Sequence, residues 1–203
     1  VHLVYPVSLV QPNKQDKPNK PIKRDRPNRP NEQDRLADFF SIPLSVRGYA
    51  SAMSHNNVVI ISAHPDDMEI GMGGTVAKLV ESMAVITSVV VTNGGRSSNP
   101  FALTEQRMVE VRREEALRAA GVLGVKDVIF CDEPDAADEI NTTAVKRRLV
   151  EILARLRPTE VYTLDEEHDR HPAHRLAGKL ARESVLEAGI VLSGGIWAYE
   201  IWG

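Results

Sequence analysis

The chain contains a single cysteine, Cys131, so it cannot form intrachain disulfide bonds, and this fits a reducing compartment. No apolar run reaches the roughly 18 residues needed to cross a bilayer. The N-terminus also lacks the basic, apolar and small-residue order of a secretory signal. We therefore expect a cytoplasmic protein without a membrane span. The remaining composition, 42% hydrophobic and 26% charged over 203 residues, is typical of one globular domain with a complete core.

Positive charge is concentrated near the N-terminus. Residues 1–52 carry a net charge of +4, and the whole-chain value of −3 then leaves −7 for residues 53–203. Such an acidic body argues against nucleic acid as a partner. Residues 11–35 are rich in Pro, Asn and charge, and nearly empty of large apolar side chains. We therefore predict a largely disordered or peripheral extension over 1–52 and the functional domain over 53–203.

From residue 57 onward, short β-branched runs alternate with stretches of helical periodicity. Strands are predicted at 57–63, 84–93, 127–132 and 160–165. Helices are predicted at 69–83, from a Thr104 cap to Gly124, from an Asn141 cap to Pro158, and at about 172–188. Residues 190–203 indicate one or two further extended segments. This alternation predicts a three-layer α/β fold, with a mostly parallel Rossmann-like sheet, helices on both faces, and functional sites beyond the carboxyl ends of the strands.

Two of these strand ends carry histidines and carboxylates. The stretch "AHPDDMEI" places His64, Asp66 and Asp67 after the first strand, and "DEEHDRHPAHRLAG" places three histidines after the fourth. His64, Asp67 and one histidine of the second stretch would form a two-nitrogen, one-oxygen ligand set. Such a set suits a catalytic zinc ion, or another divalent transition metal, with a position left open for water. Asp66, kept off the metal, could then accept a proton from that water.

Each piece also has a simpler interpretation. Asp66 and Asp67 could cap a helix, and His171 with Pro172 could be an ordinary helix entry. His168 lies among acidic neighbours and fits a solvated salt partner. The glycines of "GMGGT" match neither nucleotide-binding pattern, and close helix packing explains Gly71, Gly73 and Gly74 better. The coincidence of two His/Asp clusters on one side of the sheet favours the metal site.

The stretches "AHPDDMEIGMGGTVAKL" and "DRHPAHRLAG" resemble the two motifs of the LmbE-like, or PIG-L, family of zinc-dependent N-deacetylases. The second motif is usually HPDHxxxG, and the resemblance covers roughly residues 57–202, including the helix "VRREEALRAAGVLGV". It implies a hydrolase that removes the N-acetyl group from a small molecule of the N-acetylglucosamine (GlcNAc) type. It further implies His64, Asp67 and His174 as metal ligands, Asp66 as general base, His171 as oxyanion stabiliser or proton donor to the amine, and Arg112 and Asp135 as substrate contacts.

Two departures from the family pattern stand out. Ala173 occupies the position of an Asp that normally orients a catalytic partner, and losing such a residue commonly costs about 10- to 100-fold in affinity or activity. Asp169, Glu166 or Glu167 could replace it. The sequence also stops at Gly203, where family members continue, so the pocket is truncated, completed by a second copy in a homo-oligomer, or different in kind. The alternative to an active enzyme is a metal-binding, weakly active or inactive carbohydrate-binding homologue.

Overall fold

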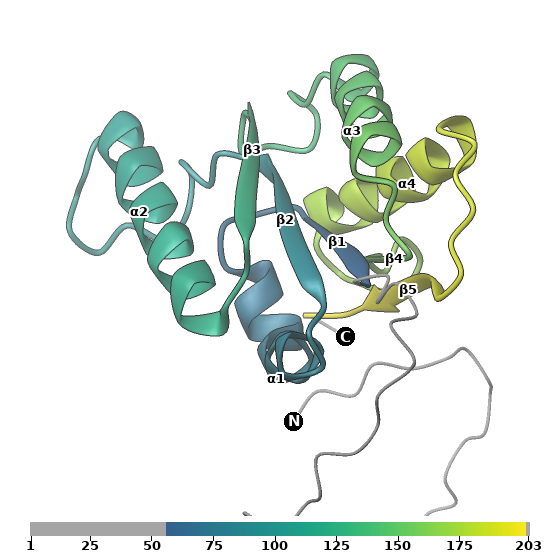
Figure 1. The fold of residues 1–203 in the computed structure, drawn as a ribbon. Coiled ribbons are helices and arrows are strands. Elements are labelled where there is room, and N and C mark those ends of the chain that lie inside the picture. The colour runs from purple at the N-terminus through teal and green to yellow at the C-terminus, as the bar shows by residue number, and fades with distance from the viewer. Residues whose placement is uncertain (1–55, 202–203) are drawn as a thin grey trace, which may run out of the picture. The chain divides into compact units, whose positions relative to one another are not determined.

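The structure is a computed structural model that describes residues 56–201 (Figure 1). In this part of the chain, strands and helices alternate throughout: β1 (Asn57–Ser62), α1 (Asp67–Glu81), β2 (Val85–Thr92), α2 (Glu105–Leu123), β3 (Asp127–Glu133), α3 (Thr142–Leu156), β4 (Glu160–Leu164), α4 (Pro172–Glu187) and β5 (Gly195–Tyr199). All strand pairs are parallel, which confirms the predicted α/β class. The predicted extension, residues 1–52, lies outside the described residues. No helix between residues 56 and 201 is long and apolar enough to span a bilayer.

The strand order of the sheet determines where a site can form. The order is β3-β2-β1-β4-β5. Strands β2 and β3 are therefore added on one side of β1, and the chain then crosses back to add β4 and β5 on the other side. Right-handed crossovers place α1 and α2 in contact with each other on one face, and α3 and α4 on the other (Figure 1). The direction in which successive strands are added to the sheet reverses between β1 and β4. The loops that follow these two strands therefore diverge and leave a crevice between them.

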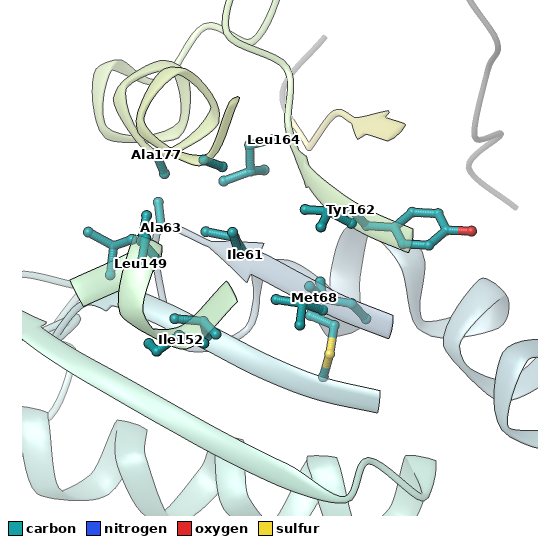
Figure 2. Close-up of a cluster of buried hydrophobic side chains, with 14 of the residues drawn as sticks. Ile61, Ala63, Met68, Leu149, Ile152, Tyr162, Leu164 and Ala177 are labelled. Atoms are coloured by element: carbon teal, nitrogen blue, oxygen red, sulfur yellow. The ribbon is translucent and has the colours of Figure 1, made fainter. Parts of the chain in front are cut away.

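The core explains why the strands are runs of β-branched residues rather than alternating patterns. Val58 to Ile61 of β1 are at most 1% exposed, because helices cover both faces of the sheet. Leu149 and Ile152 of α3 and Ala177 of α4 gather with Ile61 and Leu164 of the sheet (Figure 2). Each fully buried aliphatic side chain contributes about 1.5–3 kcal/mol to folding. The central strands are thus a rigid base for the loops at their ends.

Helix ends follow the predicted capping residues. The Thr104 side chain accepts a hydrogen bond from the backbone N–H of Arg107, and Asn141 accepts one from Ala144. Gly124 ends α2 in the left-handed conformation, with φ 78°. These local signals do not depend on distant contacts, so the boundaries they predict agree with the structure.

Glycines allow two close approaches near the crevice. A Cβ at Gly178 would lie 2.2 Å from the carbonyl oxygen of Leu164, so α4 can press directly against the end of β4. A Cβ at Gly71 would lie 2.6 Å from the ring of Tyr199, which confirms the predicted packing role of that residue. Within residues 56–201, nothing lies within 4 Å of a Cβ at Gly73 or Gly74. The packing prediction is therefore wrong for those two residues, because no other described element packs against their side of α1.

Candidate active site

The turn after β1 is held by the carboxylate of Asp67. Its Oδ2 accepts hydrogen bonds from the backbone N–H groups of Ala63, at 2.9 Å, and His64, at 2.7 Å. Asp66 occupies the N-cap position of α1 but makes no side-chain cap hydrogen bond. The capping interpretation is therefore wrong for Asp66. Its φ is 143°, which is a strained value for a residue other than glycine. The tight turn between β1 and α1 imposes this value.

The second strand end brings α4 to the same place. His171 precedes the helix and Pro172 lies in its first turn, where the missing proline N–H costs nothing. His174, one residue further into that turn than Ala173, is buried with a side chain 2% exposed. Its Nε2 lies 3.0 Å from Nδ1 of His64, although the two residues are 110 positions apart. The predicted meeting of the two motifs is thus present in the fold.

Donor atoms of three residues, His64, Asp67 and His174, converge at this point. Besides the 3.0 Å between the two histidine nitrogens, His174 Nε2 lies 3.3 Å from Asp67 Oδ1, and His64 Nδ1 lies 3.5 Å from Asp67 Oδ2. Four-coordinate zinc with bonds of about 2.0–2.2 Å requires ligand atoms about 3.3–3.6 Å apart. The two distances to Asp67 fall in this range, whereas the two histidine nitrogens are closer together than it requires. The residue types of this donor set therefore suit zinc, and the two rings would have to move apart slightly to hold the ion. His64, His171 and His174 form a further group of possible ligands, with one ring nitrogen of each within 4.8 Å of the others, and this group does not include Asp67.

Charge coupling inside the donor set is strong. Burial opposes protonation of His64, but the carboxylates of Asp135 and Asp67 outweigh it and raise the pKa of His64 to about 9. The pKa of His174 is likewise raised, because Asp67 and Asp169 outweigh its burial. Burial alone would raise the pKa of Asp67, yet the two histidines hold it well below its usual range. A metal cation must displace these protons, so its affinity falls as the pH is lowered.

Each of the two histidines is also held at its other ring nitrogen. His64 Nε2 lies 3.0 Å from Asp135 Oδ1, and His174 Nδ1 lies 3.0 Å from Asp169 Oδ2. Asp135 was expected only as a substrate contact, and Asp169 only as a replacement for the Asp missing at 173. Sequence reasoning missed both contacts with histidines, since no local pattern reports which carboxylate turns toward a distant ring.

An open pocket of about 810 Å³ lies over the donor set. This volume falls within the range of small-molecule sites. Asp66, His171, Arg112 and Asp135 all line it, so every predicted site residue faces one cavity. The Nη2 of Arg112 donates to the carbonyl oxygen of Pro65 at 2.6 Å and pairs with Asp66 Oδ1 at 2.9 Å. Arg112 therefore lies against Asp66 as well as lining the pocket.

The two residues predicted for proton transfer have shifted pKa values. Burial raises the pKa of Asp66, and the opposing effect of Arg112 only partly offsets it. Burial also lowers the pKa of His171, and positive charge on His64 and His174 lowers it further. Asp66 is thus a stronger base than an exposed carboxylate, and His171 favours its neutral form.

The position of Ala173 leaves the ring of His171 without a carboxylate. Ala173 is 2% exposed and packs in the core. Glu166 pairs with Arg182. Asp169 contacts His171 only at its backbone N–H, which donates to Asp169 Oδ1 at 2.9 Å, and not at the ring. Within residues 56–201, no carboxylate is hydrogen-bonded to the His171 ring. His168 lies outside the site, 69% exposed and 3.2 Å from Asp165, which confirms its predicted role as a salt partner.

Known proteins are similar to this chain in sequence and in fold. Diacetylchitobiose deacetylase of Thermococcus kodakarensis is 33% identical over 135 residues, which are 66% of this chain and 50% of that protein. The structure of N,N'-diacetylchitobiose deacetylase from Pyrococcus horikoshii superposes with a TM-score of 0.64 and 30% identity, covering 72% of this chain and 61% of that one. The chain therefore spans only half to two thirds of the length of these relatives.

The fold also occurs with a different activity. The 4-carboxy-2-hydroxymuconate hydratase GalB of Pseudomonas putida superposes with a TM-score of 0.62 and 25% identity, covering 70% of this chain and 65% of that one. The family model described as PIG-L, GlcNAc-PI de-N-acetylase, matches residues 59–185, a stretch that contains both motifs and every residue of the donor set. The chain belongs to the PIG-L family.

Proposed function

We propose that this protein is a zinc-dependent N-deacetylase that hydrolyses the N-acetyl group of a GlcNAc-type compound to acetate and a free amine. The observation that carries the proposal is the convergence of His64, Asp67 and His174 donor atoms within 3.5 Å, under a pocket that Asp66 also lines. The named deacetylase relatives act on an N-acetylated sugar, diacetylchitobiose. Their similarity to this chain supports the same class of substrate here.

His64, Asp67 and His174 would hold the ion. When bound, zinc supplies a Lewis acid that lowers the pKa of water to about 7 and polarises an amide carbonyl. Two neutral imidazoles and one carboxylate leave a net positive charge on such a centre, which attracts the oxygen of a carbonyl group. The donor set thus provides the electrophilic side of an amide hydrolysis, and the remaining pocket residues provide the proton transfers.

The proton transfers follow from the positions of Asp66 and His171. A carboxylate oxygen of Asp66 accepts the proton of the attacking water as its oxygen bonds to the acetyl carbon. A ring N–H of His171 donates a hydrogen bond to the developing oxyanion. When the carbon–nitrogen bond breaks, the proton that Asp66 accepted passes to the amine nitrogen, and acetate and the free amine leave. Arg112 holds the Asp66 carboxylate in place through Nη2, and together with Asp135 it can contact the sugar.

Substitution of the base tests this function. Asp66→Asn should lower turnover by about 100- to 10,000-fold while leaving the metal content unchanged. Asp132→Asn is the matched control, because Asp132 pairs with Arg113 on the surface and lies outside the pocket. The assay is amine release from N-acetylglucosaminides with sugar, malate, inositol, lipid and peptide aglycones, run beside elemental analysis for metal. Full activity of Asp66→Asn would refute the mechanism.

The absence of a carboxylate at the His171 ring favours one other candidate, a metal-holding carbohydrate-binding homologue with little activity. It predicts that the purified protein contains zinc and binds GlcNAc compounds but releases no amine from any of them. A hydratase like GalB would also release no amine. Amine release from a single N-acetylglucosaminide therefore decides for the deacetylase over both.

A further inference from the structure

We propose that Asp169 is a positioning residue of this site, which sets the tautomer and direction of His174 and ties the segment at Ile201 to it. The inference rests on the proposed metal-dependent function. Asp169 belongs to neither the donor set nor the pocket lining. It acts on residues that do, through hydrogen bonds.

Asp169 connects three residues that line the pocket. It is 1% exposed, and its two carboxylate oxygens are both occupied. Oδ1 accepts the backbone N–H of His171 at 2.9 Å. Oδ2 faces Nδ1 of His174 at 3.0 Å and accepts the backbone N–H of Ile201 at 3.2 Å. A single buried carboxylate thus joins the loop before α4, the first turn of α4 and the segment after β5.

The contact with His174 decides which ring nitrogen can bind a metal. An ionised carboxylate only accepts hydrogen bonds, so Nδ1 of His174 must carry the hydrogen. The lone pair then lies on Nε2, the atom that faces His64 Nδ1 and Asp67 Oδ1. Carboxylates placed this way fix the tautomer of a metal-binding histidine and raise its basicity. Burial keeps water from competing for either partner.

The same loop contains a matched pair for comparison. Asp165 and His168 also form an Asp–His hydrogen bond, at 3.2 Å, but His168 is 69% exposed and lies outside the pocket. Asp165→Asn therefore makes the same chemical change four residues away, without reaching the donor set.

The experiment compares Asp169→Asn with Asp165→Asn in the whole chain. An Asn at 169 can present its amide N–H to Nδ1, which favours the tautomer with hydrogen on Nε2 and removes the lone pair from the donor set. We expect Asp169→Asn to weaken zinc affinity by about 10- to 100-fold in a chelator competition, and Asp165→Asn to leave it unchanged. Circular dichroism should show that both variants are folded before their affinities are compared.

A second measurement needs no variant. Long-range proton–nitrogen NMR spectra of the zinc-loaded wild-type protein should show hydrogen on Nδ1 of His174, and hydrogen on Nε2 would overturn the proposal. If the wild type binds zinc and folded Asp169→Asn binds it with the same affinity, the positioning role alone would be overturned. Failure of the wild type to bind zinc would overturn the proposed function and the positioning role together.

Discussion

Two Asp–His pairs between the end of β4 and the first turn of α4 differ in burial, and only the buried pair belongs to the candidate site. Asp169 and His174 are 0% and 2% exposed in their side chains, and Asp165 and His168 are 18% and 69% exposed. The hydrogen bonds differ little, at 3.0 and 3.2 Å. The buried histidine directs its other nitrogen at Asp67 and His64, whereas the exposed one lies only near Asp165 and Glu200 in a surface group. The chemistry of a pair therefore depends on what surrounds it.

The largest expected difference between the pairs concerns metal binding. His174→Gln keeps the bulk of the side chain but removes a ligand, so zinc affinity should fall by at least ~100-fold, beyond the loss of an orienting residue. His168→Gln should leave the affinity unchanged. Elemental analysis of both proteins after dialysis against zinc gives the comparison. Equal zinc content in the two variants would show that His174 is not a ligand.

A smaller effect is expected from the glycine that lets α4 carry His174 against β4. In Gly178→Ala the new methyl group would meet the Leu164 carbonyl oxygen at 2.2 Å, so α4 must shift, at a cost of at least about 1–3 kcal/mol. Gly121→Ala is the control, because no atom of the described residues lies within 4 Å of a Cβ at this position of α2. It should stabilise the fold by about 0.5–1 kcal/mol. Urea unfolding measures both, and equal stability of the two variants would contradict the close approach.

The smallest effect concerns the surface pair itself. The hydrogen bond and charge of Asp165 raise the pKa of His168 above its ordinary 6.5. In Asp165→Asn, the pKa of His168 should therefore fall toward the ordinary value in an NMR titration of the ring. Because the folded-state pKa is the raised one, the small stabilisation is complete below pH 6.5 and disappears as the pH rises through the folded pKa. An unchanged titration would mean that the pair does not persist in solution.

Local signals predicted most of the fold. The strand at 57–63 and the helix from the Thr104 cap to Gly124 agree with the structure within a residue or two, because periodicity and caps act over a few positions. Helix α1 begins earlier than predicted, at Asp67 instead of Glu69, since the carboxylate of Asp67 folds back onto the preceding turn. That hydrogen bonding has no signature in apolar spacing.

Motif spacing and strand ends predicted His64, Asp67 and one histidine of the second stretch as metal ligands, and only the family resemblance selected His174. The fold brings these three side chains together, but their outer contacts could not be predicted. Among the carboxylates near Ala173, the sequence could not show which one turns inward. That choice depends on a backbone N–H at Ile201, 32 positions away from Asp169, which only the folded sheet delivers. The same holds for Asp135, which reaches His64 across the pocket.

The separation of the donors along the chain has a consequence for folding. His64 and His174 are 110 positions apart, and between them the chain must lay down β2, β3 and three helices before β4 pairs with β1. Closing so long a loop has an entropic cost that local structure does not repay, which makes this pairing a late event. A cation held by His64 and His174 would then bind only after β4 has paired with β1. Zinc should therefore slow the unfolding of the native protein, and zinc added during refolding should not accelerate the early formation of helices.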